Sequence, residues 1–241
     1  MELAAQSGFD YVIIDQEHGS FGLEAVVQMI RAAEACGITP FVRVPDHRPS
    51  GIRRVLEAGA LGVYVPDIRT AGQARDAVAS SRYLQDGNGG TRGACPTSRA
   101  TRGKGAQWAD FVRWSNAHVM VTLLIESQEG MDNLDAILAV PGIDALVLGR
   151  FDLAHELGLN GDRYGERIEA VFEVFARKVK GAGLHHVSRL GSSEPEAARA
   201  QFQALFDAGA RIFNMGSDRE FIARAFRSAL SPVRAHPSTS E

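Results

Sequence analysis

The chain has 241 residues, of which 45% are hydrophobic and 23% charged, enough for one large α/β domain or two small ones. Its formal net charge of −3 provides no attraction for nucleic acid or an anionic membrane, so neither is expected as a partner. The apolar runs are shorter than a membrane-spanning helix, and no signal peptide opens the sequence. Cys36 and Cys95 have no metal-binding or disulfide spacing, so we expect a cytoplasmic protein with reduced cysteines.

Strand patterns and helix patterns alternate along most of the chain, after a helical segment closed by Gly8. The predicted strands are Tyr11–Ile14, Thr39–Val44, Leu61–Val65, Val119–Ile125, Ala145–Leu148, His185–Val187 and Arg211–Met215. The predicted helices are Leu23–Cys36, Ser50–Ala58, Thr70–Ser81, Ala106–Asn116, Gly130–Leu138, Glu166–Ala182, Pro195–Ala208 and Asp218–Leu230. Leu84–Gly105 is glycine-rich and interrupts the alternation, with several arginines in or near it, and Phe151–Leu157 is predicted as a short loop or turn.

Strands alternating with helices predict parallel β/α units joined by right-handed connections. A (β/α)₈ barrel needs eight strands in about 250 residues, so this pattern predicts such a barrel without its first strand. That strand would lie upstream of Met1, or another element would take its place. A doubly wound open sheet is the alternative, but the glycines of Gly87–Gly93 follow a helix and not a strand, so its phosphate-binding fingerprint is absent. We expect one domain over residues 1–230 and a disordered tail over 231–241.

Polar side chains gather where the predicted strands end. The first strand opens the stretch Tyr11–Gly19, which breaks from an apolar run into acid and imidazole groups. Because the carboxyl ends of barrel strands meet at one face, these residues are expected to converge there. The set is Asp15, Glu17, His18, Arg43, Glu126 and Asp152.

Two of these residues suggest a metal site. Glu126 and Asp152 follow successive strands, and paired carboxylates form a hard oxygen site suited to Mg²⁺ or Mn²⁺. Taken singly, each carboxylate is more often a helix cap or a turn residue than a metal ligand. Together, at equivalent strand ends, they favour the metal interpretation.

Two further residues suggest proton transfer and anion binding. Arg43 lies inside an apolar strand, where an unpaired cation is costly, so it must have an anionic partner. That partner could be a substrate, or Asp15 or Glu17 in a structural ion pair. His18 is the natural acid/base candidate, although a lone loop histidine is often inert.

The segments DQEHG, FVRVP, RRVLEAGALGVYVP, GTRGA, LLIES and LGRFDLAHELG occur in this order along the chain. In combination they resemble the HpcH/HpaI aldolase family, whose members are metal-dependent (class II) pyruvate aldolases built on a (β/α)₈ barrel. The resemblance extends from Leu3 to about Leu230. It therefore covers nearly the whole chain.

The resemblance implies a role for each matching residue. Glu126 and Asp152 match ligands of a divalent cation (Mg²⁺, Mn²⁺ or Co²⁺), and His18 matches the histidine that moves protons. Arg43 matches the cation that steadies the keto oxygen and the enolate. The remaining matches are Glu57, where the family usually has an aspartate that contacts the histidine, and Gly149, Arg150 and Phe151, whose backbone amides would receive the pyruvate carboxylate.

The sequence departs from the family pattern at several points besides the first strand. The loop YLQDGNGG is longer than usual, and Leu124 stands where some members have a glutamine. Arg150 replaces a proline and adds a cation beside the expected metal site. Its side chain could turn to solvent, pair with an acid such as Glu156, or bind a second carboxylate or phosphate on the acceptor. We take the last as a hypothesis, which predicts a preference for acidic acceptors.

These features together predict a class II pyruvate aldolase, an aldehyde-lyase that cleaves or forms 4-hydroxy-2-oxo acids through a metal-bound pyruvate enolate. Its reactants would be a small oxo acid, of the pyruvate or oxaloacetate type, and an aldehyde or acyl acceptor. One alternative is a condensing enzyme of the same family that resembles citrate synthase; another is an impaired barrel acting as a binding or assembly subunit. Unpaired strand edges and an exposed helix face also predict a homo-oligomer, a dimer or hexamer by resemblance.

Overall fold

The computed structural model of the chain describes residues 1–191 and 194–234. The chain divides into two compact units, Met1–His186 and Val187–Glu241, with the boundary inside a strand. Each unit is described by itself. No helix in the described residues is both long enough and apolar enough to cross a membrane.

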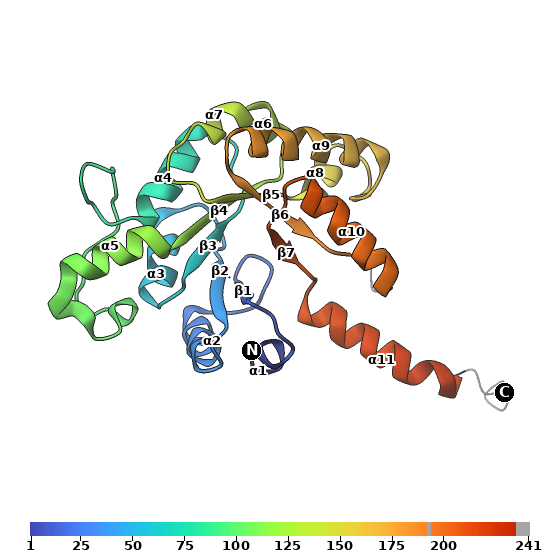
Figure 1. Cartoon of the computed structure of the whole chain (residues 1–241), viewed down its shortest axis with the longest axis horizontal. Helices are drawn as coiled ribbons and strands as arrows, with labels where there is room; N and C mark the ends of the chain where they lie inside the picture. Colours follow the sequence, from blue (N-terminus) through green and yellow to red (C-terminus); the bar gives the residue numbers. More distant parts are fainter. Residues whose placement is uncertain (192–193, 235–241) are drawn as a thin grey trace. The chain divides into compact units, whose positions relative to one another are not determined.

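Parallel strands form the centre of the first unit and lie side by side in chain order (Figure 1). They are β1 (Tyr11–Asp15), β2 (Thr39–Arg43), β3 (Gly62–Val65), β4 (Met120–Ile125) and β5 (Ala145–Leu148). The register pairs Asp15 with Arg43 and Ile125 with Leu148. The carboxyl ends of neighbouring strands are therefore aligned at one edge, as the predicted parallel arrangement requires.

Helices lie along the outer side of these strands (Figure 1). They are α1 (Glu2–Gln6), α2 (Leu23–Ala35), α3 (Pro49–Glu57), α4 (Ala71–Ser81), α5 (Trp108–His118), α6 (Gln128–Asp132), α7 (Leu134–Leu138), α8 (Arg150–Glu156) and α9 (Glu166–Gly181). Contacts of α2 with β2, α3 with β3, α4 with β4 and α9 with β5 bury the strands. Val63, Val121 and Leu123 are fully buried, so the core lies between strands and helices.

Two local predictions were wrong. Phe151–Leu157 was predicted as a loop, but α8 occupies most of it, with Leu153 N–H bonded to the Gly149 carbonyl at 3.0 Å. Leu153 and Ala154 are fully buried, and this burial stabilises a helix that is too short to show a clear apolar period. The helix predicted over Gly130–Leu138 starts two residues earlier and is divided into α6 and α7 at Asn133.

The irregular segment Leu84–Gly105 contains only a short 3₁₀ turn, η1 (Arg99–Thr101), and the start of a second, η2 (Lys104–Gln107). Arg99 holds it against the helices, because its guanidinium pairs with Glu34 of α2 and donates to the Ala58 carbonyl at 2.8 Å. Arg102 also pairs with Glu34, at 3.1 Å. The arginines of this segment are therefore at least partly structural.

The second unit contains the pairing of β6 (His185–Arg189) with β7 (Ile212–Asn214), which are parallel. Its helices are α10 (Pro195–Asp207) and α11 (Asp218–Arg234). Arg189 at the end of β6 pairs with Glu220 of α11 at 2.6 Å. Helix α11 continues four residues past its predicted end at Leu230, into the predicted tail, and residues 235–241 of that tail lie outside the described residues.

Candidate active site

Most of the residues singled out in the sequence lie at the carboxyl ends of strands in the first unit. Asp15 ends β1 and is followed by Glu17 and His18, while Arg43 ends β2. Glu126 follows β4 directly, and Asp152 lies in the first turn of α8, just after β5. This is the edge at which parallel β/α folds place their chemistry.

Arg43 is held by two acids. Its Nε donates to Asp15 Oδ1 at 2.9 Å, one terminal nitrogen to Asp15 Oδ2 at 2.5 Å, and the other lies 3.0 Å from Glu17 Oε2. The structural ion pair considered for Arg43 is therefore present. Burial alone would lower the pKa of Arg43, but the hydrogen bond and charge of Asp15 outweigh it and raise that pKa. Arg43 is thus a fixed cation at the site.

The pKa values of the two acids around Arg43 are shifted in opposite directions. Burial acts to raise the pKa of Asp15, but the hydrogen bond and charge of Arg43 outweigh it, so that pKa is lowered. Burial raises the pKa of Glu17, against the attraction of Arg43 and His18. His18 is 61% exposed, and its Nε2 lies 3.6 Å from Glu17 Oε2. Glu17 is therefore the acid beside the candidate proton carrier.

Glu57 does not meet His18 among the described residues of this chain, so its role toward His18 stays a prediction. It is the last residue of α3, the helix that leads into the start of β3, whereas His18 follows the end of β1. Helices run antiparallel to strands in β/α units, so the two residues lie toward opposite ends of the strands. The charge of Glu57 acts on Tyr83 and Arg92. The expected contact with His18 is absent within the described part of this chain.

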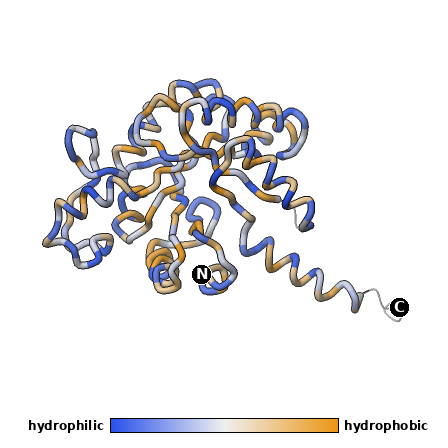
Figure 2. The backbone as a smooth tube through the Cα atoms, viewed as in Figure 1, coloured by the Kyte–Doolittle hydropathy of each residue, from blue (hydrophilic) through white to orange (hydrophobic). Residues whose placement is uncertain are grey.

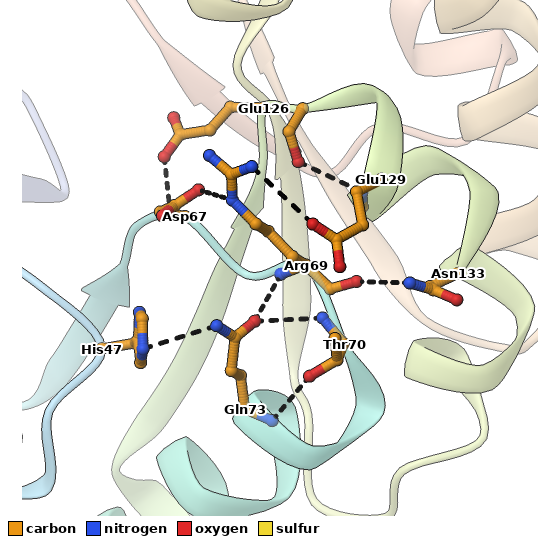
Figure 3. Close-up of polar contacts among 10 residues, drawn as sticks. His47, Asp67, Arg69, Thr70, Gln73, Glu126, Glu129 and Asn133 are labelled. Atoms are coloured by element: carbon orange, nitrogen blue, oxygen red, sulfur yellow. Dashed lines mark hydrogen bonds and ion pairs between the residues drawn. The ribbon is translucent and has the colours of Figure 1, made fainter.

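Glu126 is a buried carboxylate beside other acids. Burial raises its pKa to about 7, opposed by a hydrogen bond from the backbone N–H of Asp67 and reinforced by the charges of Glu17 and Asp152. The Asp67 nitrogen lies 2.6 Å from Glu126 Oε1 (Figure 3). Oε1 therefore has a hydrogen-bond partner, and among the described residues no hydrogen bond to the second oxygen, Oε2, is found.

The turn that supplies this N–H is itself bonded on several sides (Figure 3). Asp67 has a positive φ of 53° and pairs through its carboxylate with Arg69 Nε at 2.7 Å. Gln73 Oε1 accepts from the backbone nitrogens of Arg69 and Thr70 at 2.7 and 3.0 Å. Gln73 Nε2 must then face His47 Nε2, 3.4 Å away, which makes that nitrogen of His47 the acceptor.

Gly149 lets α8 begin next to Glu126. A Cβ at this position would lie 2.4 Å from the Glu126 Cβ and 2.7 Å from its Oε2, far inside van der Waals contact. Gly149 precedes the first residue of α8, so this close approach brings the turn that carries Asp152 toward Glu126. The start of α8 therefore lies close to Glu126, and the charge of Asp152 acts on the Glu126 carboxyl.

Arg150 and Phe151 follow at the start of α8. The Arg150 guanidinium pairs with Glu169 of α9 and stacks over the Phe172 ring, 4.0 Å from its centre, and its side chain is only 18% exposed. The structure therefore favours the pairing alternative, with Glu169 as the acid instead of Glu156. Phe151 is 56% exposed. The role of their backbone amides toward a substrate carboxylate stays a prediction.

The carboxylates fit a divalent cation. Glu126 and Asp152 offer hard oxygen donors. The pKa of Glu126 is raised by burial and also by neighbouring like charges, and such a carboxylate gains from a cation placed beside it. In the described ranges, no three His, Cys, Asp or Glu side chains are grouped to hold a metal. Two protein carboxylates with further oxygens from substrate and water is the ligand pattern that Mg²⁺ prefers.

Sequence reasoning missed Asp67 and Gln73, and it considered Glu17 only as a possible ion-pair partner of Arg43. Asp67 lies just past the end of β3, after Pro66, so its position near a strand end was a usable signal. Asp67 contributes a main-chain N–H, which every residue except proline carries, so the residue type does not reveal this role. Gln73 reads as an ordinary capping-box residue of α4, and its second role depends on the tertiary structure.

Comparison with known proteins supports these observations. The sequence model of the HpcH/HpaI aldolase/citrate lyase family matches residues 1–225. A 4-hydroxy-2-oxovalerate aldolase from Novosphingobium aromaticivorans is 37% identical over 90% of this chain and 79% of its own length.

Two solved structures share the fold. An HpcH/HpaI aldolase/citrate lyase family protein from Burkholderia cenocepacia is 32% identical, with a TM-score of 0.86 over 97% of this chain and 89% of that chain. The citrate synthase SbnG is 31% identical, with a TM-score of 0.82 over 97% of this chain and 87% of that chain. These likenesses confirm the predicted α/β fold of the (β/α)₈-barrel type. From the family match and these relatives together, the chain belongs to the HpcH/HpaI aldolase/citrate lyase family.

Proposed function

We propose that this protein is a divalent-metal-dependent aldolase that cleaves or forms 4-hydroxy-2-oxo acids through the enolate of pyruvate. The observation that carries the proposal is the placement of Glu126 and Asp152 at the strand edge that also carries the fixed cation Arg43. Membership of an aldolase family and a relative named as a 4-hydroxy-2-oxovalerate aldolase support a lyase reaction. The substrate class is inferred from both.

Glu126 and Asp152 would hold the cation, which could be Mg²⁺, Mn²⁺ or Co²⁺. When bound, such an ion supplies Lewis-acid stabilisation of negative charge on oxygen. Arg43 is fixed by Asp15 and Glu17 and adds a second positive charge without having to reorganise. The backbone amides of Arg150 and Phe151 would receive the pyruvate carboxylate.

His18 would move the proton. In the cleavage direction His18 accepts the proton of the C4 hydroxyl. The C3–C4 bond then breaks, the electron pair of that bond forms the enolate, and the aldehyde leaves. A proton then returns to C3 to give pyruvate. Glu17 Oε2 lies 3.6 Å from His18 Nε2 and would orient the imidazole for this step.

The test is cation binding by the double variant Glu126→Gln/Asp152→Asn. Calorimetry with Mn²⁺ should show binding to the wild type and none to the variant, because both carboxylate donors are gone. Release of pyruvate from 4-hydroxy-2-oxopentanoate should stop with the variant and with chelated wild type. Unchanged Mn²⁺ affinity in the double variant would contradict the assignment of Glu126 and Asp152 as metal ligands.

A second candidate is a condensing enzyme that joins an oxo-dicarboxylate to an acyl donor. It is favoured by one observation, the likeness to the citrate synthase SbnG over 97% of this chain. Thiol release from acetyl-CoA in the presence of oxaloacetate would support it, and pyruvate release from the hydroxy-oxo acid supports the first proposal. Activity in neither assay would favour the non-catalytic binding or assembly subunit, an interpretation that the retained acids and Arg43 oppose.

A further inference from the structure

The turn between β3 and α4, residues Asp67–Thr70, holds the Glu126 carboxylate with a main-chain hydrogen bond. The Asp67 N–H donates to Glu126 Oε1 at 2.6 Å, and Asp67 adopts a left-handed conformation with φ of 53°. Aspartate tolerates this conformation better than most residues do, but it still carries a cost. Backbone strain of this kind persists only where the surrounding structure enforces it.

The surrounding structure does enforce it. Ile68 is fully buried, and its N–H donates to the Leu124 carbonyl at 3.1 Å, which ties the turn to β4. Asn133, at the junction of α6 and α7, donates to the Arg69 carbonyl at 2.9 Å (Figure 3). The turn is therefore fastened both to the strand that carries Glu126 and to the helices that follow it.

Gln73 fastens the turn from the α4 side. Its Oε1 accepts from two successive backbone nitrogens, those of Arg69 and Thr70, at 2.7 and 3.0 Å. One side-chain oxygen thereby sets the orientation of the two peptide groups that follow Ile68. Because the Asp67 N–H lies on the same short turn, its aim at Glu126 depends on these bonds.

We propose that Gln73 is a positioning residue for Glu126. It shapes the Asp67–Thr70 turn, the turn fixes Glu126 Oε1, and Oε2 is left to face the cation. The inference rests on the proposed function, in which Glu126 holds a divalent cation. Residues that orient a metal ligand in this way usually account for about 10- to 100-fold in metal affinity.

The experiment measures Mn²⁺ binding to the full chain by calorimetry, so that no turnover is needed. Gln73→Met keeps the length of the side chain but removes its oxygen, and we expect a Kd about 10- to 100-fold weaker. Gln73→Glu keeps an acceptor oxygen for both backbone nitrogens and should restore the wild-type Kd. Both variants lose the donor to His47, and they differ in the acceptor oxygen and in the negative charge that Gln73→Glu adds.

Thr70→Ala is the matched control. It removes the hydroxyl that accepts from the backbone N–H of Gln73 at 3.3 Å, and so weakens the start of α4. The Thr70 backbone nitrogen still donates to Gln73 Oε1. We expect wild-type Mn²⁺ affinity and a lower unfolding temperature. If Thr70→Ala weakens binding as much as Gln73→Met does, helix stability explains the effect and the inference is overturned.

The remaining outcomes distinguish the positioning role of Gln73 from the proposed metal site. If Gln73→Met binds Mn²⁺ like the wild type while Glu126→Gln does not, the positioning role is wrong and the proposed function stands. If Glu126→Gln binds Mn²⁺ unchanged, the metal assignment falls and the inference falls with it. Should Gln73→Met fail to fold, Asn133→Ala takes its place, since it releases the same turn from the other side: weaker binding supports the role, and unchanged binding overturns it.

Discussion

Asp15 and Glu126 show how two carboxylates at the ends of strands in one sheet acquire opposite properties. Asp15 is hydrogen-bonded by a guanidinium, and the pKa of its carboxyl is lowered even though burial acts against this. Glu126 is buried with one backbone N–H and several like charges, and its pKa rises to about 7. The first is suited to hold Arg43 in place, and the second is suited to bind a cation.

The lowered pKa of Asp15 predicts a dependence of stability on pH. Because the pKa is lower in the folded state, the contribution of Asp15 is fully present above the unfolded value of about 4 and is lost as pH falls through the folded value. At neutral pH, Asp15→Asn should cost about 1.5–3 kcal/mol in the free energy of unfolding. Urea unfolding at stepwise lower pH should show a smaller acid loss for the variant. If the free energy of unfolding falls with pH to the same extent in the variant and the wild type, the predicted contribution of Asp15 is wrong.

Gly149 is the residue at which a single methyl group should disturb the site most. Gly149→Ala would place a Cβ 2.7 Å from Glu126 Oε2, so that carboxylate must move. Displacement of this size at a reacting centre costs about 100-fold in kcat/KM.

Gly72→Ala in α4 is its control. The nearest atom to its new Cβ would be Thr70 Oγ1 at 3.6 Å, an ordinary contact, so we expect unchanged kcat/KM and about 0.5–1 kcal/mol of added stability. Equal activity of the two variants would show that Gly149 is not sterically required.

At the scale of elements, α8 depends on its neighbour α9. It has seven residues, too few to be stable alone, and it carries Asp152. Its first residue, Arg150, pairs with Glu169 and stacks on Phe172 of α9. This pairing fixes the start of α8 from outside, while Gly149 allows the close approach to Glu126 from inside.

The pairing changes what we expect of Arg150. Because its guanidinium is engaged with α9, Arg150→Pro should reduce activity equally for an acidic semialdehyde and a neutral aldehyde of similar length. Proline is compatible with the first position of a helix, but it removes the Arg150 backbone N–H proposed to receive the pyruvate carboxylate, a loss that affects both acceptors equally. Loss of the ion pair and the stacking should lower Tm by about 2–4 °C for each 1 kcal/mol lost from the free energy of unfolding. A selective loss on the acidic acceptor would restore the hypothesis that Arg150 binds the acceptor.

At the scale of the whole molecule, α11 has an exposed apolar face. Ile222 is 51% exposed, Phe226 65%, Leu230 49% and Val233 65%. Their spacing of three or four residues places them on one side of the helix, and apolar and polar segments alternate along it in Figure 2. A face of this kind is a hazard for a monomer, which supports the predicted homo-oligomer.

We predict that this face of α11 is buried between copies. Ile222→Glu/Phe226→Glu should reduce the mass measured by light scattering at micromolar concentration, because it would bury charge in an apolar contact. Arg227→Glu, on the same helix, is the control and should leave the mass unchanged. A monomeric wild type would refute the oligomer itself, and an oligomeric double variant would place the interface elsewhere.

The order of strands and helices could be predicted from the sequence, because apolar periodicity and glycine positions are local properties. So could the convergence of Asp15, Arg43 and Glu126, since parallel strands align their carboxyl ends. The single domain and the nature of the cation stay predictions.

Only the tertiary structure showed the partners of these residues. It placed Glu57 away from His18, paired Arg150 with Glu169, and supplied the Asp67 N–H to Glu126. Each of these depends on a contact between segments distant in sequence, or on a backbone angle. The chain encodes such contacts only through the packing of all its elements, so no local pattern of residue types reveals them.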